Sequence, residues 1–164
     1  MTLHRTLAPA ALAALLAGPA LALSCMAPDA ARSYQQADAA EERYIVVHGT
    51  LTFDDTRLPK TDLQDQGSIP ESTPLPAQLT GMSLSADGFT TPFDKPLTLD
   101  VRCFGPWCAG GTSGIEVLGF VELRESGPVL TLDPCSSMTI PDPSEQMLNQ
   151  VIGCMKGEGC EPVQ

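Results

Sequence analysis

Histidine and cysteine are the residues of this 164-residue chain that could do chemistry, and their spacing limits what that chemistry can be. Outside the apolar N-terminal leader, His48 is the only histidine, and no Cys or acidic residue stands at zinc-ligand spacing from it. A hydrolytic triad would also need a nucleophile turn such as G-x-S-x-G, which the chain lacks. We therefore expect His48 to lie on the surface or rim of the domain, with no metal ion or other cofactor bound.

A second candidate for chemistry is the pair Cys103 and Cys108, separated by four residues that include Gly105 and Pro106. Thiol oxidoreductases place two residues between their cysteines at the start of a helix, which lowers the pKa of the first thiol. Here the spacing is longer and a turn follows, so redox catalysis is not expected. The chain also lacks a Gly-rich phosphate loop, and sequence cannot select a catalytic pair among its 20 acidic residues. The sequence predicts a protein that is not an enzyme.

The cysteines predict disulfide bonds instead. An even number of cysteines in an exported chain is typical of a disulfide framework, although many connectivities are open. Cys154 and Cys160 flank the end of a predicted helix, so they bond either to each other or to a sheet. The six residues expected to form three disulfides are Cys25, Cys103, Cys108, Cys135, Cys154 and Cys160.

The first 22 residues have the pattern of a cleaved signal peptide. A short basic start precedes an uncharged Ala- and Leu-rich run, and Ala20-Leu21-Ala22 fits the small-x-small cleavage rule. Cleavage after Ala22 leaves one mature domain, 23–164, whereas cleavage after Ser24 makes Cys25 the N-terminus. A lipid anchor on Cys25 is a further alternative. We expect an exported, periplasmic or secreted protein with no transmembrane segment after cleavage.

The charge of the chain excludes some partners. It has 20 acidic and 9 basic residues, a formal net charge of −11. Proteins that bind nucleic acids or anionic membranes use clustered Lys and Arg residues, so neither is an expected partner. The acidity itself is typical of a soluble protein in an exposed compartment, and binding of a cationic partner is the alternative.

The elements that position these residues begin with a short helix and a strand. Asp29 can cap a helix that runs through Gln35. The strand Tyr44–Phe53 is the clearest, because its side chains alternate with period two. Gly49 in its middle indicates a bulge or tight coiling. The set expected to face the core is Ile45, Val47, Gly49, Leu51 and Phe53.

A long loop and a hairpin follow this strand. Residues 54–76 hold four prolines and almost no periodic apolar pattern, which predicts a loop that is either functional or a mobile insertion. Strands are expected over 77–84 and 89–93, with Asp87-Gly88 as the turn between them.

The segment around Cys103 to Cys135 completes the predicted sheet. Pro92 and Pro96 indicate an edge position, or a break before the next strand. Alternating patterns then predict strands over 97–103, 115–123 and 129–132.

The C-terminal part predicts a helix. Asp142 is the expected cap, Pro143 the first helical residue and Glu145 the partner in a capping box, and Gly157 can end the helix. Its apolar face is formed by Met147, Leu148, Val151, Ile152 and Met155. Five or six strands, a helix near each end and no alternating strand–helix pattern predict a mainly β domain, a small antiparallel barrel or sandwich.

The order of several short motifs resembles a known family. Cys25, Pro28, Ala37-Asp38 and a Val- and Gly-containing strand come first, and a segment ending at Cys135 and a terminal helix with Cys154 come later. This order is similar to that of netrin-type modules and tissue inhibitors of metalloproteinases, although Ala27 replaces the second cysteine of their Cys-x-Cys start. The resemblance implies an OB-like barrel in which Cys25 bonds to the sheet, at Cys103 or Cys108. It also implies that the amine and carbonyl of an N-terminal Cys25 can chelate a protease zinc.

These observations favour one function and leave a second open. The first is an exported, non-enzymatic domain that binds an unknown protein or small molecule at the barrel face or the 54–76 loop. The alternative is an inhibitor of a metal-dependent protease that acts through Cys25 and Met26. This inhibition requires cleavage directly before Cys25, because Leu23 and Ser24 would remove the free amine.

Overall fold

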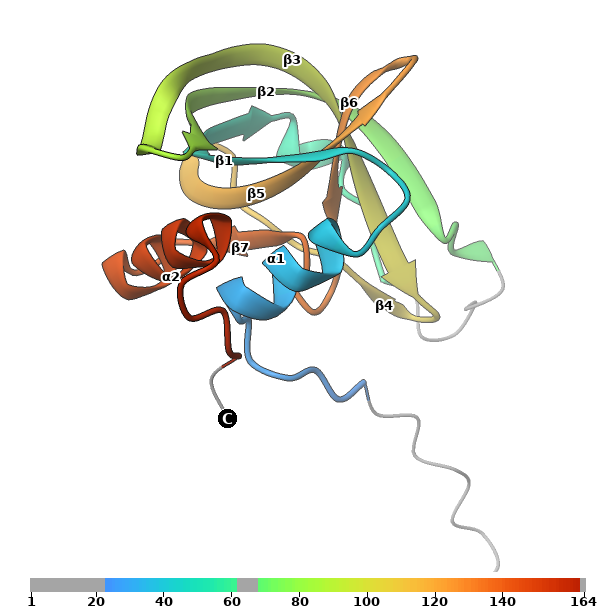
Figure 1. The fold of residues 1–164 in the computed structure, drawn as a ribbon. Coiled ribbons are helices and arrows are strands. Elements are labelled where there is room, and N and C mark those ends of the chain that lie inside the picture. Colours follow the sequence, from blue (N-terminus) through green and yellow to red (C-terminus); the bar gives the residue numbers. More distant parts are fainter. Residues whose placement is uncertain (1–22, 62–67, 163–164) are drawn as a thin grey trace, which may run out of the picture.

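The fold is mainly β, with one helix near each end of the described chain (Figure 1). The computed structural model describes residues 23–61 and 68–162. The helices are α1 (Ala30–Asp38), the short 3-10 helix η2 (Asp55–Arg57) and α2 (Glu145–Lys156). The strands are β1 (Tyr44–Phe53), β2 (Ser72–Ser85), β3 (Gly88–Phe104), β4 (Trp107–Cys108), β5 (Ile115–Arg124), β6 (Gly127–Leu132) and β7 (Thr139–Pro141).

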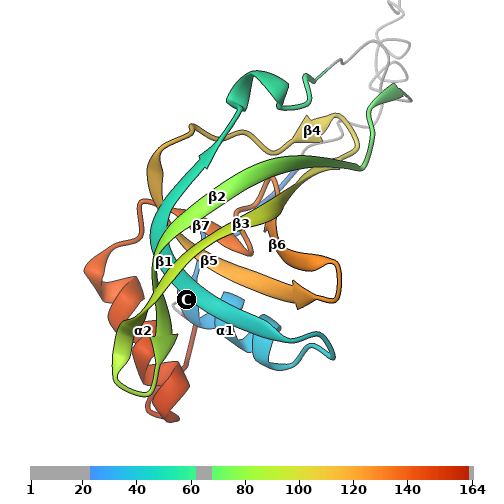
Figure 2. The same cartoon turned by 90° about the horizontal axis from the view of Figure 1, so that it is seen from above.

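The strands form one seven-stranded sheet in the order β1-β2-β3-β6-β5-β7, with β4 paired to β3. β5 also pairs with β1, so β1, β2, β3, β6 and β5 each have at least two paired neighbours. The β3–β6 pairing is parallel, which corrects the all-antiparallel arrangement expected from the sequence. β1, β2 and β3 are strongly curved (Figure 2).

Two apolar clusters fill the interior. The larger lies among the strands and includes Val47, Leu51 and Leu99. The smaller joins the strands to both helices, which lie on the same side of them (Figure 1), and includes Val46, Phe120 and Val151. The expected core set of β1 is confirmed for its buried residues, but Val46 on the opposite face is buried too. The helices cover that face, and the period-two pattern alone could not show it.

β2 and β3 are longer than the sequence pattern predicted. β2 begins at Ser72, so the last part of the predicted 54–76 loop is strand, and η2 lies within the loop's first part. Residues 62–67 of that loop lie outside the described residues. β3 runs unbroken through Pro92 and Pro96, so the break that was one of two expectations is wrong. The other expectation, an edge position, is confirmed, because this part of β3 pairs with β2 and β6 joins only from Thr98.

The position of the prolines explains this continuity. The backbone N–H of Cys103 donates to the Glu71 carbonyl. In this register, hydrogen bonds between β2 and β3 fall on odd-numbered residues as far as the irregularity at Ser83/Leu84. The prolines occupy even positions, where an N–H would point away from the partner strand. β1 pairs with β2 only from residue 77, and β6 with β3 only from residue 98. The prolines at open edges are Pro74, Pro76, Pro92 and Pro96.

Gly49 allows β1 and β2 to lie close together. It lies opposite Gly81 of β2, and a Cβ on Gly49 would stand 2.3 Å from the carbonyl oxygen of Thr80. Of the two expectations for Gly49, a bulge or tight coiling, the bulge is wrong, because the register is regular there and the irregularity lies between Ser83 and Leu84. Both glycines are needed because a side chain at either position would meet backbone.

The N-terminal cap of α1 is confirmed, and that of α2 is corrected. The Asp29 carboxylate accepts the backbone N–H of Arg32 at 2.9 Å. At α2, Ser144 is the cap and accepts the N–H of Met147 at 3.3 Å. Asp142 is not the cap, because its N–H donates to the Glu116 carbonyl and continues the β5–β7 pairing. Gly157 ends α2 in the left-handed conformation, as predicted.

All six cysteines are paired, which confirms three disulfides. The pairs are Cys25–Cys135, Cys103–Cys108 and Cys154–Cys160. The pairing of Cys25 with Cys103 or Cys108, implied by the resemblance, is wrong. Cys103 and Cys108 lie directly opposite each other in the β3–β4 hairpin and bond to each other. Three disulfides are typical of a protein that matures in an oxidising, exported environment.

Candidate functional site

Cys25 and Met26 lie on an exposed segment, residues 24–28, that leads into α1. The Met26 side chain is 68% exposed, more than any other large apolar side chain of the described residues. The Cys25–Cys135 disulfide ties this segment to the turn that follows β6, with the two Cα atoms 5.2 Å apart. The bond also uses the sulfur atom that a lipid anchor on Cys25 would need.

The turn that holds Cys135 is built around a buried carboxylate. Asp133, only 5% exposed, accepts the backbone N–H groups of Cys135 at 2.8 Å and Ser137 at 2.9 Å. The hydroxyl of Ser33 on α1 donates to the Ser137 carbonyl, which links the turn to the helix. The segment with Met26 is therefore fixed at one end by a disulfide and at the other by α1.

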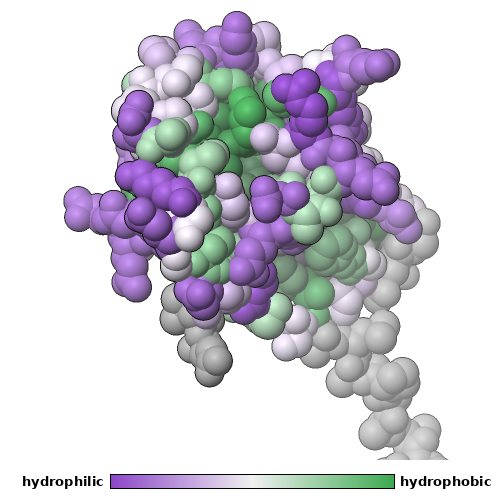
Figure 3. Space-filling model, viewed as in Figure 1, coloured by the Kyte–Doolittle hydropathy of each residue, from purple (hydrophilic) through white to green (hydrophobic). Residues whose placement is uncertain are grey.

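A groove opens beside Met26. Its cavity volume is about 590 Å³, and its walls come from residues 26–30, Arg32 of α1 and the first turns of α2, including Met147 and Gln150. A smaller hollow of about 200 Å³ adjoins it around the Cys25–Cys135 disulfide and shares Met26 and Arg32. We call the larger hollow the Met26 groove. The face that carries both helices shows apolar surface between hydrophilic patches (Figure 3).

The lining of the Met26 groove is mainly apolar, with a few polar side chains. Met26, Ala27, Pro28, Ala30 and Met147 supply apolar surface, and serine and glutamine side chains supply polar groups. Arg32 is the single basic residue in the lining, and its guanidinium lies 2.7 Å from the Met26 sulfur. Asp29 is the single carboxylate in the lining, and it also caps α1 by accepting the backbone N–H of Arg32.

The other residues considered for chemistry lie away from the Met26 groove, and the buried Nε2 atom of His48 has no hydrogen-bond partner among the described residues. His48 is partly exposed on β1, with its Nε2 atom 3.9 Å from a carboxylate oxygen of Glu116 and its ring 5.8 Å from that of Phe89. Cys103 and Cys108 are bonded to each other at the β3–β4 hairpin. Among residues 23–61 and 68–162, no group of three or more His, Cys, Asp and Glu side chains could hold a metal ion. No helix of this part of the chain is long and apolar enough to span a bilayer.

Two further hollows lie elsewhere. One, of about 400 Å³, lies on β2 and β3 beside the β5–β6 turn, and prolines such as Pro76 and Pro96 form half of its lining. The other, of about 360 Å³, lies between the C-terminal end of α1, the start of β1 and α2. Neither shares a lining residue with the Met26 groove.

Sequence reasoning found part of this site. It selected Cys25 and Met26, and the structure brings both to its edge. It missed Arg32, Ser144 and Gln150, because their proximity depends on how α1 packs against α2. It predicted Met147 as core, and Met147 both packs on the smaller apolar cluster and lines the groove.

The chain matches no protein-family model, no curated protein and no solved structure.

Proposed function

We propose that this protein is an exported, non-enzymatic binding domain that receives an apolar group of its partner in the Met26 groove. The observation that carries the proposal is an apolar groove of about 590 Å³ beside an exposed methionine on a disulfide-fixed segment. Its volume lies within the range of roughly 300 to 1,000 Å³ that is usual for ligand sites. Because the disulfide fixes the segment that carries Met26, less conformational entropy is lost when a partner binds. The partner is a protein or a small molecule, and not a nucleic acid.

The strand order supports a finer proposal about the scaffold. β1, β2, β3, β6 and β5 follow one another in a path that returns to β1, and one of its pairings is parallel. We infer an OB-like barrel, a small Greek-key barrel that binds ligands in many proteins. Together with the three disulfides, the leader over residues 1–22 supports export through a cleaved signal peptide.

Site-specific photo-crosslinking in the exporting host tests the position of the binding surface. A photoreactive phenylalanine analogue replaces Met26 in the Met26 groove, Thr98 on the β2–β3 face, or Phe104, which is 42% exposed on the β3–β4 hairpin. We expect a discrete adduct from position 26 and none from position 104. Adducts from position 98 alone would move the site to the barrel face. Equal adducts from all positions, or none, would contradict a specific site.

Inhibition of a metal-dependent protease is the second candidate. It is favoured by the exposure of residues 24–28, a segment that the Cys25–Cys135 disulfide holds in place. Zinc chelation would need the free amine of Cys25. N-terminal sequencing of the exported protein tests this. A mature chain that starts at Cys25 would support inhibition by zinc chelation, and one that starts at Leu23 would rule it out.

A further inference from the structure

The hollow of about 360 Å³ at the end of α1 has two tyrosines and two carboxylates in its lining. Tyr34 and Asp38 are four residues apart on α1, so they share one face of the helix. Glu42 and Tyr44 are two residues apart where the chain enters β1. Each wall therefore contributes one phenol ring and one carboxylate. The remaining lining is mainly apolar and includes the buried Val46.

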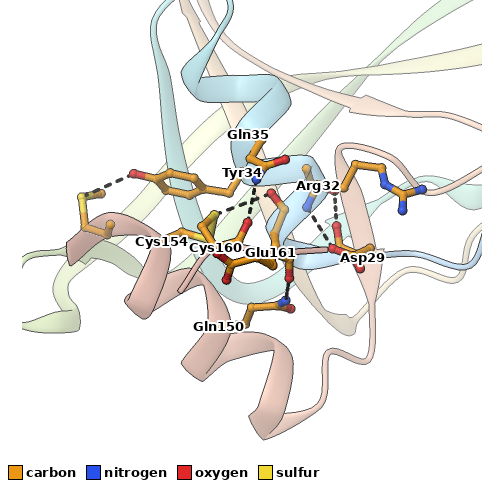
Figure 4. The surroundings of a disulfide bond; sticks show 11 residues. Asp29, Arg32, Tyr34, Gln35, Gln150, Cys154, Cys160 and Glu161 are labelled. Carbon is orange, nitrogen blue, oxygen red and sulfur yellow. Dashed lines mark hydrogen bonds between the residues drawn. A yellow bond between two sulfur atoms is a disulfide. The ribbon is translucent and has the colours of Figure 1, made fainter. Parts of the chain in front are cut away.

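The ring of Tyr34 is held at its hydroxyl end. This hydroxyl donates to the Met155 sulfur of α2 at 3.9 Å, so the phenol reaches from one helix to the other (Figure 4). Both tyrosines are about half-buried, whereas both carboxylates are exposed. The hollow thus has aromatic and apolar walls and an acidic surround in contact with solvent.

The charged side chains in the lining of the hollow are both carboxylates, Asp38 and Glu42. Neither Asp38 nor Glu42 forms an ion pair with another described residue, and no Lys or Arg is part of the lining. Burial raises the pKa of Tyr34, and the charge of Asp38 raises it further. Burial also raises the pKa of Tyr44, as do the nearby carboxylates of Glu122 and Glu42, while Arg124 lowers it. Arg124 is itself bound to Glu122 through two hydrogen bonds of 2.6 Å.

We propose that this hollow binds a small organic cation that carries a quaternary ammonium group. Aromatic faces attract such cations through their quadrupole, and nearby carboxylates add charge attraction. A quaternary ammonium has no N–H groups, so apolar walls such as Val46 and Leu84 can contact its methyl groups without leaving donors unpaired. The net charge of −11 also favours the approach of cations to the protein as a whole.

Isothermal titration of the mature, disulfide-bonded protein with choline tests the proposal. The neutral isostere 3,3-dimethylbutan-1-ol, which has the same shape without the charge, is the reference ligand. We expect saturable binding of choline at one site and at least about tenfold weaker binding of the isostere. No binding of choline, or equal binding of the two ligands, would overturn the proposal.

Variants then assign the binding to this hollow. Glu42→Gln should weaken choline binding about threefold to tenfold, and Tyr44→Leu should weaken it at least as much, whereas Tyr44→Phe retains the ring and should bind. Glu125→Gln removes one exposed charge from the β5–β6 turn, outside the hollow, and is the matched control. An equal loss from Glu125→Gln and Glu42→Gln would show a general charge effect and overturn the assignment. Because Glu42 is exposed, its variant tests the site even if Tyr44→Leu fails to fold.

Discussion

Gly49 and Gly81 are the residues at which the sheet tolerates least change. Their Cα atoms face each other across β1 and β2, and a Cβ on Gly49 would lie 2.7 Å from the Cα of Gly81. We expect Gly49→Ala to lower the free energy of unfolding by about 2 kcal/mol or more, because backbone must shift to admit the methyl group. Urea denaturation measures this. Gly110→Ala is the control, since no atom lies within 4 Å of its added Cβ, and an equal loss there would contradict the explanation.

The two tyrosines make stability depend on pH at the alkaline end. Each has a pKa raised above the ordinary 10.0 by burial and nearby carboxylates. The folded state therefore holds the phenol proton more tightly than the unfolded chain does. The stability this provides is complete below pH 10.0 and is lost as the pH rises through the folded pKa.

We accordingly expect Tyr44→Phe to reduce the fall in unfolding free energy between about pH 9 and about pH 11. Urea unfolding at several pH values measures the fall. Phenolate absorbance gives an independent check, because the chain has only 2 tyrosines. Ionisation of both at the pKa of the unfolded chain would disprove the assignment.

Among single residues, the sequence predicted one helix cap correctly and the other wrongly, and it predicted the disulfide bonding of Cys25 but not its partner. Asp29 was found because it is the single capping residue directly before its helix. Asp142 and Ser144 were both plausible caps for α2, and the choice depends on a hydrogen bond from Asp142 to Glu116 on a distant strand. Cys25 could likewise be expected to form a disulfide, but its partner is set by the position of the turn at Cys135. Local sequence patterns show which residues can cap a helix or form a disulfide. They do not show contacts with residues that are distant in the chain.

Among the elements, β2 and β3 have unusual open edges. Pro92 and Pro96 remove two N–H donors from the part of β3 that pairs only with β2, and Pro74 and Pro76 do the same on β2. Open edges with free N–H groups are templates for pairing with another chain. Proline in these strands therefore acts against association, and this is why a proline-containing segment could form a strand that its sequence did not predict.

We expect the double variant Pro92→Thr/Pro96→Thr to keep the fold but to associate as its concentration rises, because two donors return to an open edge. Size-exclusion chromatography with light scattering, over a range of concentrations, measures the association. Thr91→Val is the control, since it adds apolar surface on the same strand without adding a donor. If Thr91→Val associates as strongly as the double variant, the association comes from added apolar surface and not from the restored N–H donors.

For the whole molecule, sequence reasoning recovered the composition of the fold better than its connections. The class, both helices and most strands followed from local periodicity. The parallel β3–β6 pairing and the packing of α1 on α2 join residues far apart in the chain, and no local pattern specifies them. The Met26 groove shows the same difference. The sequence selected Met26 as a site residue, but it could not show that the first turns of α2 form the opposite side of the groove.

The three disulfides should differ in what they contribute to this long-range order. Cys25–Cys135 closes a sequence separation of 110 residues, whereas Cys154–Cys160 closes one of 6. A crosslink restricts the unfolded chain more when the loop it closes is longer. Replacing both members of a pair by serine avoids leaving a lone thiol. We expect Cys25→Ser/Cys135→Ser to cost about 4 to 5 kcal/mol of unfolding free energy, and Cys154→Ser/Cys160→Ser about 2 kcal/mol.

Urea unfolding of both variants and the parent protein under non-reducing conditions measures this difference. Equal losses would mean that the Asp133 hydrogen bonds already hold the Cys135 turn in place, so that the bond to Cys25 adds little to the folded domain. A larger loss in the first variant would show that the disulfide beside the Met26 groove also links the N-terminal segment to the stability of the whole sheet. A partner that binds this segment would then bind a surface that is held rigid wherever the protein is folded and oxidised.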